Sequence, residues 1–125
     1  MIKAFILFIS ILLPISSAFA QEDKLAIIGI MQHCQEANIF YQRCMPQDTS
    51  THKVFENNLT KITERALQVV KETNPTMSDT EISKTYWVRR EMLEKSASRG
   101  IDKRGCDAAQ SSPKQYQACV EWKPQ

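Results

Sequence analysis

Four cysteines carry the clearest chemical pattern in this chain of 125 residues: Cys34, Cys44, Cys106 and Cys119. Thiols can pair as disulfides, bind zinc or act as nucleophiles. Zinc sites usually take two cysteines from one short C-x-x-C-type segment, and no such spacing occurs here. The even number of cysteines and their wide spacing therefore favour two disulfide bonds, provided that the chain reaches an oxidising compartment.

The first twenty residues have the three parts of a secretory signal peptide. Lys3 supplies a positive charge, Ala4 to Leu13 is an almost unbroken apolar run, and residues 18–20 (Ala-Phe-Ala) have the small-x-small pattern of a cleavage site. The run is shorter than the ~20 apolar residues of a membrane-spanning helix. We therefore expect cleavage after Ala20 and a single mature domain, residues 21–125, in the periplasm or outside the cell.

Composition argues against several other classes of protein. Sixteen basic residues face fourteen acidic ones, and a net charge of +2 is too small for a protein that binds nucleic acid electrostatically. The hydrophobic fraction of 42% and the charged fraction of 24% are those of an ordinary globular domain. No long apolar run follows the leader, so we expect no membrane span.

Catalytic chemistry has no comparable support. The two histidines, His33 and His52, belong to no recognisable motif, and we interpret them as surface or helix-capping residues. The sequence lacks the H-E-x-x-H, G-x-S-x-G, phosphate-loop and calcium-loop patterns, and three glycines are too few to build such loops. Asn58-Leu59-Thr60 is a glycosylation sequon inside a predicted helix, and we give it no functional weight. We expect no enzyme activity, no metal site and no cofactor.

A tryptophan on the flank of a predicted helix is the best candidate for a binding residue. Tyr86 lies on the apolar stripe of its helix, whereas Trp87 is turned about 100° from that stripe, towards charged residues that include Arg90. Tryptophan and arginine are enriched in interface hot spots. The alternative is that the 101–111 loop or the C-terminal tail covers Trp87, because large aromatic side chains are mostly buried.

Two further apolar residues, Ile39 and Phe40, lie off the main stripe of the first predicted helix. They form a second candidate patch, either for a partner protein or for a homodimer. Trp122 lies close to Cys119 in the sequence, and we expect it to pack against the first helix.

Apolar residues recur at helical spacing almost throughout the chain. Helix caps and prolines divide it into four helices, at about 23–44, 48–74, 78–100 and 112–124. Gly100 is placed to end the third helix, and residues 101–111 are predicted to be a loop with one helical turn. The cleanest apolar stripe belongs to the second helix: Phe55, Leu59, Ile62, Ala66, Val69 and Val70.

Helix geometry selects one of the three possible disulfide pairings. Cys34 and Cys44 are ten residues apart on one predicted helix, or about 15 Å along its axis, and a disulfide needs Cα atoms within roughly 7 Å. Both bridges must then join the first helix to the C-terminal segment. The first and last helices of an up-down bundle are antiparallel, so the pairs are crosswise, Cys34–Cys119 and Cys44–Cys106. The predicted fold is an all-α, up-down bundle of about four helices, stapled by two disulfides.

The segment from Cys34 to Cys44, Cys-Gln-Glu-Ala-Asn-Ile-Phe-Tyr-Gln-Arg-Cys, is followed later by Trp87-Val88-Arg89 and by two further cysteines. These segments resemble the small exported helical proteins of the lysozyme-inhibitor type found in bacterial envelopes. The resemblance implies binding to a protein of the envelope. Periplasmic immunity proteins, which neutralise toxins that degrade the cell wall, have the same build.

These observations favour an exported, non-enzymatic protein that binds and inhibits a partner in the cell envelope, such as a cell-wall hydrolase or a toxin. The residues expected to contact the partner are Trp87, Arg90, Ile39 and Phe40. Two alternatives stay open. A periplasmic chaperone or stress protein would expose apolar surface on a trigger, which two bridges would oppose. A carrier would hold a small apolar ligand inside the bundle, in a cavity lined by Met31, Met92 and Tyr86.

Overall fold

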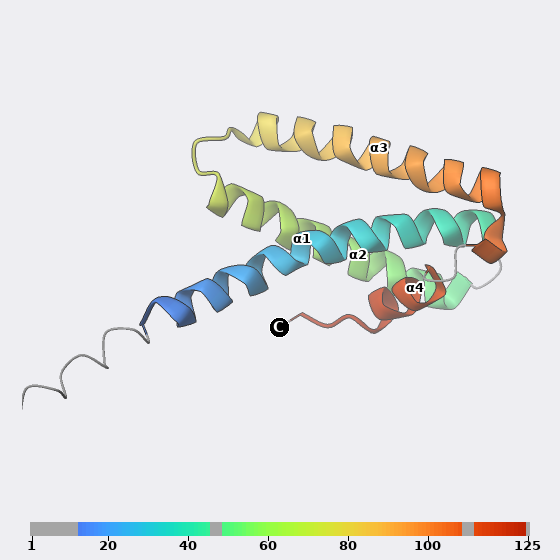
Figure 1. Cartoon of the computed structure of the whole chain (residues 1–125), viewed down its shortest axis with the longest axis horizontal. Helices are drawn as coiled ribbons and strands as arrows, with labels where there is room; N and C mark the ends of the chain where they lie inside the picture. Colours follow the sequence, from blue (N-terminus) through green and yellow to red (C-terminus); the bar gives the residue numbers. More distant parts are fainter. Residues whose placement is uncertain (1–12, 46–48, 109–111, 125) are drawn as a thin grey trace, which may run out of the picture.

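The computed structural model of the chain describes residues 13–45, 49–108 and 112–124. This part of the chain forms α-helices and one short 3-10 helix and contains no strand, so the predicted all-α architecture is confirmed. In chain order the elements are α1 (Leu13–Cys44), α2 (Thr49–Thr73), α3 (Asp79–Arg104), η1 (Cys106–Ala108) and α4 (Ser112–Glu121). Successive α-helices run in opposite directions, as in an up-down bundle (Figure 1).

Helix α1 begins earlier than predicted, at Leu13 rather than near Asp23. Pro14 stands in the first turn of this helix, where its missing N–H group costs nothing. The expected cleavage point after Ala20 therefore lies within a continuous helix of the full chain. Residues 1–12 lie outside the described residues, and removal of the leader stays a prediction.

Helix α3 continues past Gly100 and ends at Arg104, so the predicted end was wrong. The glycine that ends it is Gly105, which has φ 76° and donates its N–H to the carbonyl of Ile101 at 2.7 Å. A positive φ favours glycine, which explains why the helix ends there. Arg43 of α1 holds the added turn, because it pairs with Asp102 and donates to the carbonyl of Ser98 at 3.2 Å.

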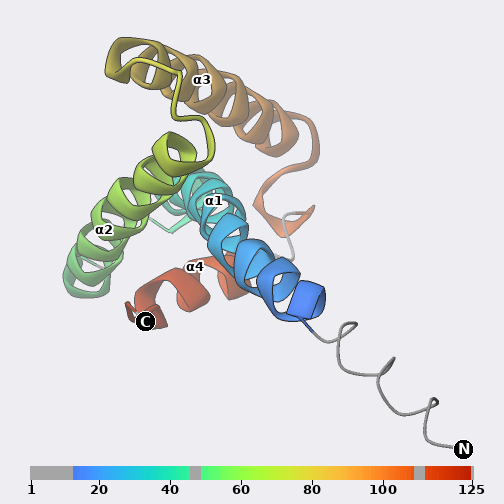
Figure 2. The same cartoon turned by 90° about the vertical axis from the view of Figure 1, so that its left-hand side faces the viewer.

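Helix α1 is the central element of the bundle. It packs against α2, α3 and α4, whereas α2 and α3 meet little beyond their connection. Viewed along α1, the helices α2 and α4 lie together on one side and α3 stands apart from α4 (Figure 2). The molecule therefore has a closed side, made by α1, α2 and α4, and an open side, where α3 lies on α1.

The hydrophobic core belongs to the closed side. Its fully or nearly fully buried members come from α1, α2 and α4 alone: Ile27, Met31, Cys34, Ala37, Tyr41, Phe55, Ile62, Ala66, Val69, Tyr116 and Cys119. Of the predicted stripe of α2, Phe55, Ile62, Ala66 and Val69 belong to this core and Leu59 lies at its edge, whereas Val70 is not part of the cluster. Helix α3 buries only Ile82, which is not a member of this cluster. Trp122 packs against the core.

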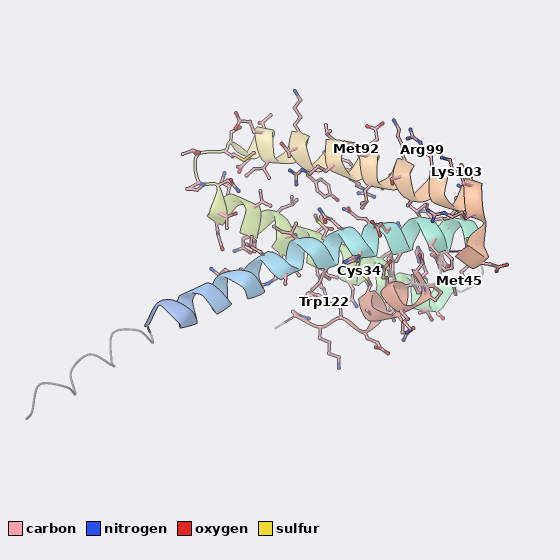
Figure 3. All side chains as sticks on the ribbon, in the orientation of Figure 1. Cys34, Met45, Met92, Arg99, Lys103 and Trp122 are labelled. Atoms are coloured by element: carbon pink, nitrogen blue, oxygen red, sulfur yellow. A yellow bond between two sulfur atoms is a disulfide. The ribbon has the colours of Figure 1, made fainter. Side chains whose placement is uncertain are left out.

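Both predicted disulfides are present. Cys34 pairs with Cys119 at a Cα–Cα distance of 5.9 Å, and Cys44 pairs with Cys106 at 5.8 Å. The first bridge is buried in the core between α1 and α4, where Figure 3 labels Cys34. The second lies at the surface, since Cys106 is exposed, and it ties the end of α1 to the segment that follows α3.

An aromatic stack joins the three helices of the closed side. The ring of His52 lies parallel to that of Tyr41, with centroids 3.8 Å apart, and the rings of Phe55 and Tyr116 are 4.7 Å apart. His52 Nδ1 is 3.3 Å from the Tyr116 hydroxyl, and His52 Nε2 is 3.0 Å from Glu56. The prediction of a surface or capping role for His52 was therefore wrong. His33 is exposed, as expected.

Asn58, the first residue of the sequon, fastens the end of α4 to α2. Its side-chain amide donates to the carbonyls of Cys119, Val120 and Trp122 at 2.9, 3.0 and 3.1 Å. The last carbonyls of a helix have no partner within the helix, so Asn58 satisfies groups that α4 cannot satisfy itself. This role connects residues 61 to 64 positions apart in the chain.

Candidate binding site

The outer face of α3 carries an exposed apolar patch made by Trp87, Val88 and Met92. Their exposed fractions are 57%, 51% and 66%. Residues 101–104 continue α3, and the described tail packs at the core, so neither covers Trp87. In Figure 3 Met92 and Trp122 lie on opposite sides of α1. We call this patch the outer face.

Arg90 holds Trp87 in place without covering it. Its guanidinium lies 5.2 Å from the centre of the Trp87 ring, and its Nε donates to Glu94 at 2.8 Å. The hydrogen bond to Glu94 is the main cause that raises the pKa of Arg90 above its usual value. The Tyr86 ring meets the Trp87 ring edge-on at 5.3 Å. Trp87 is thus exposed but restrained, which lowers the entropy lost when it is buried by a partner.

The second predicted patch does not exist at the surface. Phe40 is only 6% exposed, and Ile39 is half-buried in a shallow hollow shared with α3. The prediction was wrong because α1 is central and packs on more than one side. Ile39 therefore lies beside α3 rather than in open solvent.

A groove opens between α1, α2 and α3, on the open side of the molecule, and encloses about 380 Å³. Most of its wall is apolar and comes from all three helices: Ile28, Met31, Leu67, Val70, Ile82 and Leu93. Of the residues expected in a ligand cavity, Met31 and Tyr86 line this groove. Met92 does not, because it points to solvent from the outer face.

Two polar residues of the groove, Gln35 and Arg90, meet at Tyr86. Its hydroxyl accepts hydrogen bonds from Gln35 Nε2 and from Arg90 Nη1, each at 3.3 Å. Gln35 is buried, with 4% of its surface exposed. Arg89 also lines the groove, and it has no hydrogen bond or ion pair within the described ranges. Arg90 contacts both Tyr86 in the groove and Trp87 on the outer face, so it links the two surfaces.

Among the described residues, no group of three His, Cys, Asp or Glu side chains lies close enough to hold a metal ion. No helix in the described part of the chain is long and apolar enough to cross a membrane. Comparison of the chain with protein-family models, with curated proteins and with solved structures gives no match. The outer face and the groove are therefore the two candidate functional sites.

Proposed function

We propose that this chain is an exported protein without catalytic activity that binds an envelope protein through the outer face of α3 and inhibits it. The partner is a hydrolase that acts on the cell wall, or a toxin with that activity, against which the chain serves as an inhibitor or immunity protein. The observation that carries the proposal is Trp87, which is 57% exposed and held beneath a guanidinium. Exposed tryptophans of this kind dominate the binding energy of many interfaces.

The shape of the outer face favours a cleft as its counterpart. The outer face is the exposed side of a helix and is therefore convex, whereas the sites in which proteins bind their ligands are usually concave. Trp87, Val88 and Met92 could fill such a site, while Lys84, Glu91 and Lys95, which are exposed on the same helix, would bring charged groups into the contact. If the outer face occupied the cleft of the hydrolase, the substrate of that enzyme could not enter, so binding alone would inhibit it.

Two disulfides support a preformed surface. They join α1 to α4 and α1 to η1, next to the end of α3, so α3 cannot drift from the bundle at that end. A surface that is already ordered loses less entropy on binding. The same bridges oppose the large opening that a chaperone would need. Disulfides are also compatible with a periplasmic or extracellular location.

The test uses the full chain, exported by a host cell and recovered oxidised, as bait for envelope extract. Trp87→Ala is run beside Val54→Ala, a matched control that removes an exposed apolar residue of α2. We expect one stoichiometric hydrolase that Trp87→Ala binds about thirtyfold more weakly and Val54→Ala binds normally. The activity of that hydrolase must fall in proportion to the added protein.

Other outcomes would overturn the proposal. Equal capture by the wild-type and Trp87→Ala chains would remove the outer face as the contact. Capture without loss of hydrolase activity would leave a binding protein that is not an inhibitor. Many weakly bound unfolded proteins would indicate a chaperone. A dimeric mass that Trp87→Ala makes monomeric would assign the outer face to a homodimer.

A second function, the carriage of a small ligand, is favoured by a separate observation. The groove of about 380 Å³ has a mostly apolar wall and a few convergent polar groups, which is the usual make-up of a ligand site. It is bordered by α3 but does not include the outer face.

A further inference from the structure

The groove has room for the apolar part of a small molecule. Its volume of about 380 Å³ falls within the range of roughly 300–1,000 Å³ found for ligand pockets. Several of its side chains are only partly covered by the fold, and Leu25 at its end is 44% exposed. An apolar chain placed there would remove these surfaces from water, which is the main source of affinity in such sites.

The hydrogen bonds at Tyr86 leave a donor, rather than an acceptor, free at this point of the groove. Tyr86 already accepts from Gln35 and Arg90, so both lone pairs of its hydroxyl oxygen are occupied. Its own O–H has no acceptor among the described residues. A ligand that offers an acceptor at this point would complete the network, whereas a ligand that offers a donor would not.

The charge of the groove has one sign. Arg89 and Arg90 line it, and none of its described lining residues is an aspartate or glutamate. Arg90 is paired with Glu94, but Arg89 has no partner in the described part of the chain. An unpaired guanidinium beside an apolar wall is suited to a carboxylate, which it can bind through two parallel hydrogen bonds.

We propose that the groove binds one molecule of a free long-chain carboxylate, of the fatty-acid class. The chain lies between the apolar side chains of α1, α2 and α3, and the carboxylate lies at Tyr86 and Arg89. This inference rests on the second candidate function, because it names the ligand class of that groove. It does not depend on partner binding by the outer face.

The test is a calorimetric titration of the exported, oxidised full chain with dodecanoate, kept below its micelle concentration. Dodecanol and dodecyltrimethylammonium are titrated in parallel, since they have the same chain with a neutral and a cationic head. We expect one dodecanoate per protein, bound at least about tenfold more tightly than dodecanol, because a charge-assisted hydrogen bond is worth that much. The cationic amphiphile should bind most weakly.

Two variants locate the head of the ligand. Arg89→Gln should lower the affinity for dodecanoate to that for dodecanol and leave dodecanol binding unchanged. Arg99→Gln is the matched control, because Arg99 is an exposed arginine further along α3 and does not line the groove (Figure 3). It should change neither affinity. An equal effect of both variants would show general attraction to a basic surface and overturn the site.

A second pair of variants locates the chain. Val70→Trp fills the groove from α2 and should abolish binding, whereas Val54→Trp places the same ring on an exposed position of α2 and should not. Unchanged binding by Val70→Trp would overturn the assignment to this groove. Helical content and both disulfides are checked in each variant, so that loss of the fold is not read as loss of the site.

The remaining outcomes separate the inference from the function on which it rests. Equal affinity for dodecanoate and dodecanol would overturn the carboxylate and leave a carrier of apolar ligands. Absence of binding by every amphiphile would overturn both. Binding to anionic phospholipid vesicles without binding to monomeric dodecanoate would assign the groove to a membrane lipid and overturn the free acid.

Discussion

On the closed side of α1, the helices α2 and α4 bury an aromatic stack, a disulfide and nearly all of the core, whereas α3 on the open side buries one residue of its own. Helix α3 is also held at its ends. Its capping box, Ser78 with Glu81, and the ion pair of Lys71 with Asp79 fix the start, while Arg43 fixes the end. The residues that stabilise the fold are therefore concentrated on the closed side, whereas both candidate binding surfaces lie on the open side.

The two disulfides repeat this contrast. They close segments of similar length, with sequence separations of 85 and 62, so the chain-entropy model gives each about 4 kcal/mol. They differ in surroundings, because Cys34 and Cys119 are buried and Cys106 is exposed. A comparison of the two bridges therefore isolates the effect of the core from the effect of loop closure.

The largest expected effect is removal of the buried bridge. Cys34→Ala with Cys119→Ala should lower the free energy of unfolding by about 4 kcal/mol and by at least about 1 kcal/mol more for the space left in the core. Cys44→Ala with Cys106→Ala should cost only the first amount. Urea denaturation of the two double variants measures both values. An equal loss would show that the surroundings of the bridges make no difference.

Replacement of a core aromatic residue comes next. Phe55→Ala should cost about 3–5 kcal/mol, because Phe55 is fully buried against Tyr116. Ile82→Ala, at the only buried position of α3, should cost about 2 kcal/mol, since Ile82 borders a groove into which its neighbours can relax. The measurement is again urea denaturation. A larger loss for Ile82→Ala would contradict the assignment of stability to the closed side.

A smaller effect is expected at the end of α4. Asn58→Ala should cost about 1–3 kcal/mol, because it leaves partly buried carbonyls without a donor. Asn57→Ala is a matched control at the adjacent exposed position of α2 and should stay within about 0.5 kcal/mol of the wild type. Amide hydrogen exchange should show faster exchange in α4 for Asn58→Ala only. Unchanged exchange would mean that the three bonds do not hold the tail.

The smallest effect on stability is expected on the outer face. Trp87→Ala should change the free energy of unfolding by no more than about 0.5 kcal/mol, because the side chain is mostly exposed. Acrylamide should quench Trp87 fluorescence, measured in Trp122→Phe, more strongly than Trp122 fluorescence, measured in Trp87→Phe. Strong destabilisation by Trp87→Ala, or equal quenching of the two tryptophans, would show that Trp87 is buried. The contrast between a stabilising closed side and a binding open side would then be lost.

Features governed by local geometry could be predicted from the sequence. The rise of a helix excluded a bridge between Cys34 and Cys44, and antiparallel packing then selected the observed pairs. The stripe that begins at Phe55 was visible because α2 packs its core residues along one side. The start of the third helix near residue 78 was equally local, since the capping box that fixes it joins Ser78 and Glu81, three residues apart.

Features that depend on contacts between distant segments could not be predicted in this way. Phe40 was assigned to the surface because the sequence does not show that α1 has neighbours on more than one side. His52 and Asn58 owe their roles to Tyr116 and to the end of α4, more than sixty positions away. The groove is lined by residues of three helices, so the spacing of apolar residues within any one helix does not reveal it.

The sequon at Asn58 leads to a consequence for how the protein can be produced. An N-linked sugar is joined to the same Nδ2 atom that donates to the carbonyls of Cys119, Val120 and Trp122. Since that nitrogen has only two hydrogens, a glycan would remove one donor and place a bulky group where the tail docks. During secretion through a eukaryotic pathway, glycosylation of Asn58 Nδ2 would thus compete with its hydrogen bonds to the end of α4. The correctly folded molecules should be those in which Asn58 is not glycosylated.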